Sequence, residues 1–579
     1  MSDDRDDFRV RPGKGRSRGS SRRPLSLAAQ VRRAAARAGH VARGPRRGGG
    51  TGRLGRGRGA ALLPRRSARM RRVVIKARIV RHLGARFRAA PLCRHIAYLE
   101  RDGVTRDAAP AAMFDAGSEV ADGDAFAGRC GEDRHHFRFI VSPEDAGELA
   151  DLRGFTRELM GDVARDLGTK LDWVAVDHWN TDNPHVHVLV RGVADNGADL
   201  VIDRSYISRG MRDRAEARAT LELGPRSERE IERALAREVR AERWTSLDRG
   251  LVARANGEGR VDLRQTQGAS PSRRDTLLIG RAQTLERLGL AAPAGPAQWT
   301  LQSDLESQLR DLGERGDVIA RIHRAMREDR DAIRSERLAL HANDIPQGVV
   351  GRLVERGLHD ELAGTAYAII DGTDGRLHHL RFADLELTGD ANPGAIVELR
   401  SWDGNGKAPR AILAVRSDLP LDSQVRAGGA TWLDRQLLSG SDDAAHSGFG
   451  AAVRDAMVAR EDHLIGAGLA HRRGGKVLLA PRLIETLRRN ELRDQAARIA
   501  ARTGLVPRDP VPGGSVAGIY RERLNLASGR FAMIDDGLGF QLVPWRPALD
   551  RQLGQSVTGT LNARGGIDWT IGRSRGLGI

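Results

Sequence analysis

The stretch Pro184-His185-Val186-His187-Val188 decides the fold of the chain around it. Successive side chains of an extended strand point to opposite faces, so His185 and His187 share one face while the valines are buried on the other. The preceding run, Leu171 to Asp177, predicts a second strand, and the turn-prone residues 180–184 predict a hairpin between the two strands. The hairpin places His178 opposite the histidine pair.

Three histidines in this arrangement indicate a metal centre. Neutral imidazoles are good ligands for a divalent cation, and three of them leave coordination positions open, as in a catalytic site rather than a closed structural one. Asp182, inside the hairpin turn, could orient one ligand by accepting its second ring N–H, and turn stabilisation explains the same residue equally well. The alternative for the histidines is that a valine-rich strand carries them without any metal.

The histidine spacing resembles that of a known family. His178…His185-Val186-His187, or H-x(6)-H-x-H, is similar to the third motif of conjugative relaxases, the HUH single-strand endonucleases of the mobilization type. The segment His95 to Gly103, which contains Tyr98, is similar to the first motif of that family. Tyr98 is also the only tyrosine that precedes the histidines. The other three tyrosines are Tyr206, Tyr367 and Tyr520.

The resemblance implies an enzyme that is a DNA strand transferase. In this family a tyrosine, here Tyr98, attacks a DNA phosphate that a divalent metal on three histidines polarises, and Mg or Mn would be the metal in the cell. The substrate would be single-stranded transfer-origin DNA, cut through a covalent 5′-phosphotyrosine intermediate and later rejoined during conjugative mobilization of a plasmid or an integrated element. A coupling protein and a type IV secretion apparatus would be partners. By ligand preference alone, imidazoles suit Mn, Zn, Ni or Co better than Mg.

The residues around Tyr98 predict a helix. Pro91 suits a first helical position, and an apolar stripe follows at helical spacing, formed by Leu92, Ile96 and Leu99. Tyr98 lies off this stripe, so it should reach solvent or substrate, and Arg94 one turn earlier could favour its phenolate. We expect Arg94, Arg101 and Arg191 to contact DNA. The alternative is an amphipathic tyrosine at the edge of a core.

The surrounding sequence predicts an α+β fold, with an antiparallel sheet and helices on one of its faces. Residues 72–80 and 135–141 are rich in β-branched and aromatic residues, as is typical of strands. Ser142-Pro143-Glu144-Asp145 predicts a helix start with a serine cap, and apolar residues from Leu149 to Leu167 continue that helix at spacings of three and four. The uncovered face of the sheet would be left for DNA.

Basic charge is concentrated at the N-terminus. The chain has 95 Lys and Arg against 76 Asp and Glu, a net charge of +19, and residues 1–90 alone hold 27 basic and 4 acidic residues. Arg/Gly-rich stretches such as Gly55–Gly59 cannot bury a core, so we expect residues 1–70 to form a disordered arm that neutralises DNA phosphates. Two cysteines are too few for a disulfide framework, and no apolar run approaches the ~20 residues of a membrane span. We therefore expect a cytoplasmic protein without membrane insertion.

The C-terminal half contains an internal duplication. Residues 288–291 and 299–301, Leu-Gly-Leu-Ala and Trp-Thr-Leu, parallel residues 467–470 and 477–479, Ala-Gly-Leu-Ala and Val-Leu-Leu. Each copy continues into a helix, with Leu309 in the first and Leu487 in the second, and then into similar strand starts at Tyr367–Asp371 and Phe531–Asp535. We expect each copy to be a winged-helix-like module followed by a small β-barrel, which would bind either DNA or protein. The expected domains are a basic arm at 1–70, an HUH-type nuclease domain at 71–250, winged-helix-like modules at 270–345 and 450–505, and small β-barrels at 350–418 and 515–579.

Three other functions fit parts of this pattern. An HUH-type replication initiator would share the chemistry, but nothing resembles the helicase that often accompanies one, because the sequence has no G-x(4)-G-K-[ST] phosphate loop. A non-catalytic DNA-binding protein with a degenerate nuclease domain should have lost the tyrosine or a histidine, and all four residues are present. A zinc hydrolase that uses activated water would usually add acidic ligands to the histidines.

Overall fold

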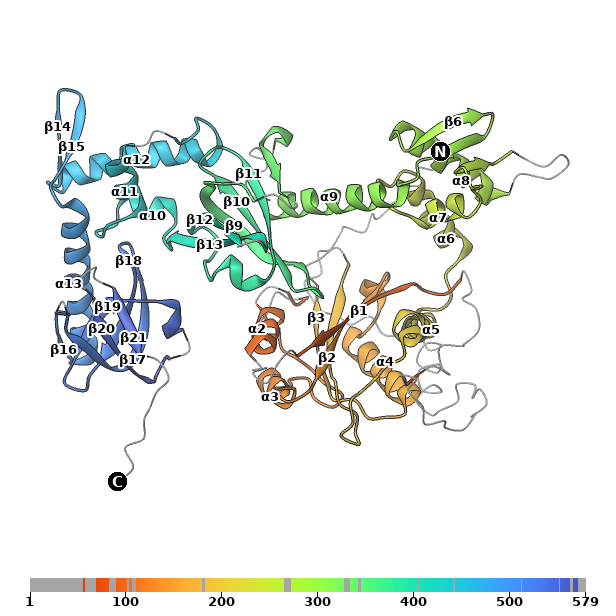
Figure 1. Ribbon diagram of the computed structural model, residues 1–579, viewed down its shortest axis with the longest axis horizontal. Helices are drawn as coiled ribbons and strands as arrows, with labels where there is room; N and C mark the ends of the chain where they lie inside the picture. The colour runs from red at the N-terminus through yellow and green to blue at the C-terminus, as the bar shows by residue number, and fades with distance from the viewer. Residues whose placement is uncertain are drawn as a thin grey trace, which may run out of the picture. The chain divides into compact units, whose positions relative to one another are not determined.

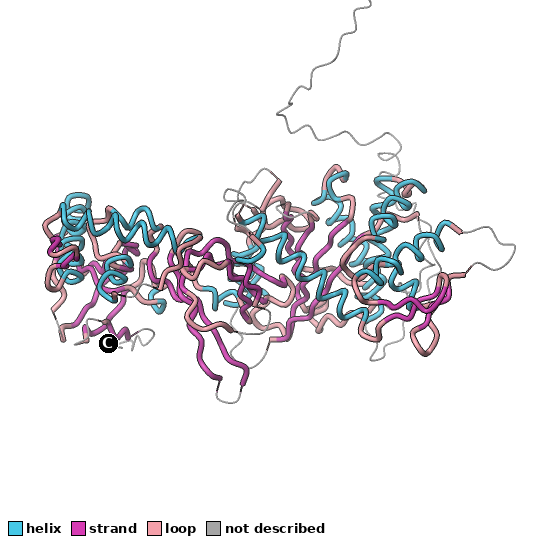
Figure 2. Tube along the Cα trace, turned by 90° about the horizontal axis from the view of Figure 1, so that it is seen from above, coloured by secondary structure: helices cyan, strands magenta, loops and turns pink. Residues whose placement is uncertain are grey.

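The computed structural model describes residues 56–57, 69–82, 90–101, 104–106, 111–179, 183–264, 272–326, 334–341, 345–404, 407–440, 443–511, 513–550, 552–562 and 566–570. The chain divides into two compact units, one within residues 1–241 and 245–305 and the other within 242–244 and 306–579. Helices and strands occur in both units (Figures 1 and 2), so the architecture is mixed α+β. Within the described ranges, no helix has the length and apolar character needed to cross a bilayer. Nearly all of the predicted basic arm, Asp182 and the side chain of Arg94 lie outside the described residues.

The first unit is built on a four-stranded antiparallel sheet with the strand order β1-β2-β4-β3. The predicted hairpin is confirmed, because β3 and β4 pair directly and His178 lies opposite His185. The strands are β1 (Val73–Arg81), β2 (His135–Pro143), β3 (Trp173–His178) and β4 (His185–Arg191).

Helices pack on both faces of this sheet, so the expectation that they would lie on one face is wrong (Figure 1). On one face, α4 (Leu152–Leu167) and α5 (Met211–Leu223) enclose the larger apolar core. On the other face, α2 (Ala90–Leu99) and α3 (Gly123–Arg129) pack over β3 and β4. These two strands are apolar on both sides, with Val174, Val176 and Leu189 facing the α2 stripe, and an amphipathic helix must bury its apolar face.

The predicted helix start at Ser142 is also wrong. Ser142 is paired with Val74 in the β1–β2 ladder, and β2 continues to Pro143. A short 3-10 turn, Ala146–Glu148, follows the strand. The helix begins at Leu152, where the Asp151 side chain accepts a hydrogen bond from the Gly154 amide at 2.9 Å. Asp151 is therefore the cap, since Ser142 is held in the sheet by its pairing with β1.

The rest of the first unit is mainly helical. The charged stretch 205–242 is divided into a π-helix and two α-helices, with a break at Gly224 and Pro225. A three-stranded antiparallel sheet with the order β5-β7-β6 completes the unit. These elements are the π-helix Tyr206–Gly210, α6 (Glu228–Val239), α7 (Ser246–Val252), β5 (Arg260–Asp262), α8 (Arg273–Arg287), β6 (Ala291–Gly295) and β7 (Gln298–Leu301).

The second unit contains two six-stranded sheets, each preceded by a long helix. The first sheet has the order β13-β12-β9-β10-β11-β8 and follows α9, and the second has the order β16-β19-β18-β17-β20-β21 and follows α13. Each sheet has one short parallel strand, β8 beside β11 and β16 beside β19.

The elements of the second unit have the following bounds. The long helix and strands of the first sheet are α9 (Leu305–Ala325), β8 (Leu338–Leu340), β9 (Val350–Asp360), β10 (Thr365–Gly372), β11 (Leu377–Phe382), β12 (Ile396–Gly404) and β13 (Lys407–Ser417). The helices and hairpin between the sheets are α10 (Leu421–Val425), α11 (Trp432–Ser439), α12 (Gly448–Gly466), β14 (Ala470–Arg473), β15 (Lys476–Leu479) and α13 (Leu483–Thr503). The last sheet comprises β16 (Val506–Pro507), β17 (Ser515–Leu526), β18 (Gly529–Asp535), β19 (Gly539–Pro544), β20 (Ser556–Leu561) and β21 (Ile567–Thr570).

Candidate metal centre

Two neighbouring strands bring the three histidines together. His178 at the end of β3 is paired with His185 at the start of β4, and His187 lies two residues further along the same face. All three side chains are buried, and their ring centroids are 4.6 to 5.6 Å apart. One ligand nitrogen from each ring lies within 4.8 Å of the other two. These buried histidines could hold a metal ion.

Backbone carbonyls determine which nitrogen of two rings is available to a metal. His178 donates from Nε2 to the Leu99 carbonyl at 2.8 Å, and His185 donates from Nδ1 to the Asn183 carbonyl at 3.0 Å. A carbonyl can only accept, so Nδ1 of His178 and Nε2 of His185 are the basic atoms of the neutral rings. Nε2 of His185 lies 3.1 Å from Nε2 of His187. The donor set therefore fits a metal with further positions for water or substrate, because metal-binding imidazoles are usually oriented by a hydrogen bond from their second nitrogen.

Helix α2 connects this centre with Tyr98. The carbonyl that holds His178 belongs to Leu99, the residue after Tyr98, so the end of α2 is attached to the histidine hairpin. The predicted stripe of α2 is buried, and Tyr98 is only partly buried at the edge of the same cluster. The guanidinium carbon of Arg101 lies 4.1 Å from the centre of the Tyr98 ring. The fold thus keeps the phenol at the border between core and solvent, beside a cation.

The other three tyrosines are buried. Tyr206, the nearest alternative nucleophile, has 1% of its surface exposed and lies in the core on the opposite face of the sheet from the histidines. Its hydroxyl donates to Asp166 at 2.9 Å, and burial together with the Asp166 carboxylate raises its pKa well above the usual range. Tyr367 and Tyr520 are buried in the second unit. Tyr98 is therefore the one tyrosine of the chain that is not fully buried.

The two predicted DNA contacts whose side chains the structure describes, Arg101 and Arg191, lie in different surroundings. Arg101 stacks on Tyr98 and donates to its carbonyl at 3.0 Å. Arg191 forms a bidentate pair with Asp133, at 2.8 and 3.0 Å, and this pairing raises the pKa of Arg191. A DNA phosphate at Arg191 would have to compete with a buried carboxylate, and its role as a DNA contact stays a prediction.

A basic strip that sequence reasoning missed crosses β1 and β2 on the histidine face, beside the half on which α2 and α3 pack. Register places Ile140 of β2 beside His187 and Lys76 of β1 beside Ile140, with Arg78 and Arg138 in the next row. Lys76 and Arg78 are exposed, and strand spacing puts Lys76 about 10 Å from His187 across two strands. Burial and the charge of Arg78 lower the pKa of Arg138 to about 10, so it stays protonated at neutral pH. Lys76 and Arg78, at alternate positions of a predicted strand, were the signal in the sequence that could have revealed this strip. The Leu99 and Asn183 carbonyls that orient two of the histidines are backbone atoms, so no side-chain pattern could have revealed them.

A second histidine cluster on this face is an internal hydrogen-bond chain. Arg138 donates to Nε2 of His136 at 3.1 Å, so His136 must donate from Nδ1 to Nε2 of His82, 2.7 Å away. His82 in turn donates to the Asp133 carbonyl. Burial, with smaller contributions from Arg138 and His82, lowers the pKa of His136 to about 3. All ring nitrogens are used in the chain, which suits a structural role.

Comparisons with known proteins concern mainly the second unit. Residues 278–415 and 403–578 match the model of a family described as protein of unknown function (DUF3363), and the matched stretches together span more than half of the 579-residue chain. No curated protein and no solved structure matches the chain.

Proposed function

The chain belongs to the DUF3363 family, described as proteins of unknown function, and we propose that it is a relaxase, a metal-dependent DNA strand transferase that nicks and rejoins single-stranded transfer-origin DNA. The observation that carries the proposal is the convergence of His178, His185 and His187 at the end of the helix that carries Tyr98. Three imidazoles leave coordination positions of the metal open, and a phosphate group could occupy them. A structural metal site, by contrast, is usually closed by a fourth protein ligand.

The chemistry requires one activated hydroxyl and one stabilised phosphate. A divalent metal, Mg or Mn in the cell, would neutralise the non-bridging oxygens of the scissile phosphate. The Tyr98 oxygen forms a bond to phosphorus as its proton leaves, the bond to the 3′ oxygen breaks, and that oxygen takes up a proton. Arg101, stacked on the ring, places a positive charge beside the phenol. Because one phosphate ester replaces another, the reverse reaction rejoins the strand without an external energy source.

The basic strip gives the single strand a path to the centre. Lys76 and Arg78 are exposed on the same face as the histidines, and Arg138, which is more buried, lies beside Arg78 on that face. Backbone phosphates that follow β1 and β2 would meet these cations before they reach His187. The strip would position the strand without reading its sequence.

The presence of all three histidines together with Tyr98 helps to choose among the alternative functions. A degenerate nuclease domain has no reason to keep three convergent imidazoles, two of which are oriented by backbone carbonyls. A replication initiator of the same superfamily would use the same residues and differ in its target. A zinc hydrolase would release its product, whereas a strand transferase keeps one end of the DNA on the protein.

We also propose that the C-terminal half carries two copies of one module. Thr245 and Asp248 form a capping box at α7, and Arg281 pairs with Asp248 with both side chains fully buried. Thr431 and Asp434 form the same capping box at α11, and Arg460 pairs with Asp434 with equal burial. In both cases the Thr-x-Leu-Asp-Arg segment precedes a helix, a two-stranded hairpin, a long helix and a six-stranded sheet. The copies would therefore begin near 245 and 431, earlier than the winged-helix-like modules predicted at 270 and 450.

These modules would serve as docking surfaces for DNA or for the transfer machinery. A cytoplasmic relaxase must be delivered with its strand, so a coupling protein and a type IV secretion apparatus are the partners we propose. The winged-helix and small-barrel descriptions of the helical and sheet parts belong to the same proposal.

Cleavage of labelled DNA tests the proposed function. Single strands from both sides of the gene, labelled at one end, are incubated with the full-length protein and Mn or Mg, with and without EDTA. The proposal expects one strand to be cut at one position only when metal is present, and expects no cutting by a His187→Ala variant. Cutting that EDTA leaves unchanged would overturn the metal-dependent mechanism.

A further inference from the structure

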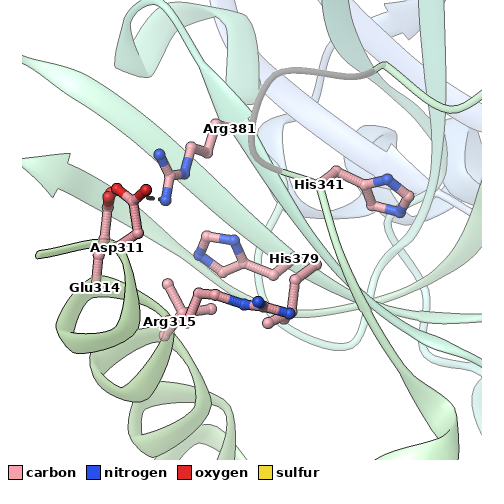
Figure 3. A pocket seen from close by; sticks show the side chains of 8 residues that line it. Asp311, Glu314, Arg315, His341, His379 and Arg381 are labelled. Atoms are coloured by element: carbon pink, nitrogen blue, oxygen red, sulfur yellow. Dashed lines mark ion pairs between the residues drawn. The ribbon is translucent and has the colours of Figure 1, made fainter. Parts of the chain in front are cut away.

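The second unit contains a polar cavity that the proposed nuclease chemistry does not use. It has a volume of about 420 Å³ and lies between α9 and the edge of the first six-stranded sheet. Its polar lining, shown in Figure 3, comprises Asp311, Glu314 and Arg315 from α9, and His341, His379 and Arg381 from the sheet side. This volume is in the range of small-ligand sites.

Two buried nitrogens of lining residues, and a third on nearby Arg321, have no hydrogen-bond partner among the described residues. They are Nε2 of His379, Nε of Arg381 and Nη1 of Arg321, which lies one turn beyond the lining residues of α9. Arg381 does bind Glu314 at 2.7 Å through another nitrogen, as the dashed line in Figure 3 marks. Buried guanidinium N–H groups usually have acceptors, so these two, one on Arg381 in the lining and one on nearby Arg321, suit a ligand with acceptor atoms.

The electrostatic surroundings favour a negative ligand. Burial, followed by the charges of Arg321, His359 and Arg381, lowers the pKa of His379 to about 3, so its ring is neutral at pH 7. The Tyr367 ring is stacked on His379, and Arg321 lies 4.3 Å from the centre of that tyrosine ring. Glu314 is already engaged by Arg381 and by His359 at 3.0 Å. Two carboxylates, Asp311 and Glu314, and two arginines, Arg315 and Arg381, line the cavity, and Arg321 near His379 adds one further cation.

The second sheet provides an internal comparison, because the same interface there is apolar. His379 is paired with Ile369 in the first sheet, and Leu542 is paired with Met533 in the second. Counted from the equivalent leucines Leu309 and Leu487, Ile499 of α13 takes the position of Arg321. Ile499, Met533 and Leu542 form one apolar cluster. A helix and a sheet of this kind can thus pack without buried polar groups, so the polar residues of the first interface are not needed for its packing.

We propose that the cavity between α9 and β11 binds a phosphate-class oxyanion, held by Arg321 and Arg381 beside His379. The two guanidinium groups would donate to the oxyanion through the N–H groups that have no partner among the described residues. The phosphate could belong to a free mononucleotide or to a 5′-phosphorylated DNA end. The inference does not depend on the nuclease proposal, since none of these residues belongs to the histidine centre.

Binding measured by calorimetry tests this proposal in the full-length protein. Three ligands are titrated in a chloride buffer of physiological ionic strength: inorganic phosphate, a deoxymononucleotide, and a short oligonucleotide with and without a 5′ phosphate. The double variant Arg321→Ile, His379→Leu introduces the residues of the second interface, so it is expected to fold. Arg493→Ala, which removes a cation at the position of α13 equivalent to Arg315, is the matched control.

The wild type and Arg493→Ala should bind phosphate-bearing ligands alike, and the double variant should lose at least tenfold in affinity. The double variant should also melt at a higher temperature than the wild type without ligand, because it replaces buried polar atoms that lack partners. Binding of phosphate and mononucleotide would identify a free ligand, and binding only of the 5′-phosphorylated strand would identify a DNA end. If the double variant bound all three ligands as the wild type does, or the wild type bound none of them, the proposal would be wrong.

Discussion

Replacement of His185 by alanine should abolish most of the stabilisation that a bound metal would give to the first unit. Hydrogen-bond partners of metal ligands typically change metal affinity by about 10–100-fold when they are lost, so loss of one of only three protein ligands should exceed ~100-fold. At a metal concentration 100 times the wild-type Kd, binding stabilises the folded wild type by about 2.7 kcal/mol. For a unit of this size that corresponds to a Tm increase of about 5–11 °C.

The variant should show almost none of this increase. With its Kd raised ~100-fold, the same metal concentration equals its Kd, and the stabilisation falls to about 0.4 kcal/mol, or about 1–2 °C in Tm. Thermal unfolding of chelator-treated protein, with and without Mn, measures both values. His136→Ala is the control, because His136 is buried on the same face but bound to His82 and Arg138. An equal metal-induced shift in His185→Ala and wild type would refute the metal centre.

Three further perturbations test other parts of the account. Replacing Lys76 and Arg78 by alanine should weaken binding of all single strands. In binding titrations at several salt concentrations, the slope of log affinity against log salt should become shallower by about 0.7 per lost phosphate contact. Arg165→Ala on α4, on the opposite face of the sheet, should leave this slope unchanged. The pKa of His136 is about 3 in the folded protein and 6.5 when unfolded, so between these values the unfolded state binds one more proton than the folded state. The free energy of unfolding should therefore fall from pH 6.5 toward pH 3, by up to about 1.4 kcal/mol per pH unit. Denaturant titrations of His136→Asn should show a weaker dependence of this free energy on pH. Arg281→Leu and Arg460→Leu should each lower the unfolding free energy by about 3–5 kcal/mol, because each leaves a fully buried carboxylate unpaired, and clearly unequal losses in denaturant titrations would argue against equivalent modules.

Local periodicity predicted the parts of the site that depend on a single strand or helix. Alternation placed His185 and His187 on one face, and turn-prone residues predicted the pairing with His178. The helical stripe around Tyr98 was predicted for the same reason, because burial of Leu92, Ile96 and Leu99 requires only a period of 3.6.

Features that depend on long-range packing could not be predicted in this way. An apolar stripe does not reveal which surface will cover it, and α2 proved to lie on the face opposite α4. Ser142 has every local feature of a helix cap, but pairing with Val74 holds it in a strand. The Leu99 carbonyl that orients His178 is a backbone atom 79 residues away, and backbone acceptors carry no sequence signal. Arginines are mostly exposed in proteins, yet Arg281 and Arg460 are both fully buried against aspartates.

Covalent capture of DNA tests the central claim most directly. Wild-type protein is incubated with metal and a cleavable single strand labelled at its 3′ end, denatured, and digested for mass spectrometry. The account predicts a denaturation-resistant adduct on the peptide that contains Tyr98, and predicts no adduct from Tyr98→Phe, which removes one oxygen and keeps the packing of the ring. Both proteins should still bind metal and DNA. Cleavage by the wild type without any adduct, or an undiminished adduct in Tyr98→Phe, would contradict the claim that Tyr98 is the nucleophile of a strand transferase.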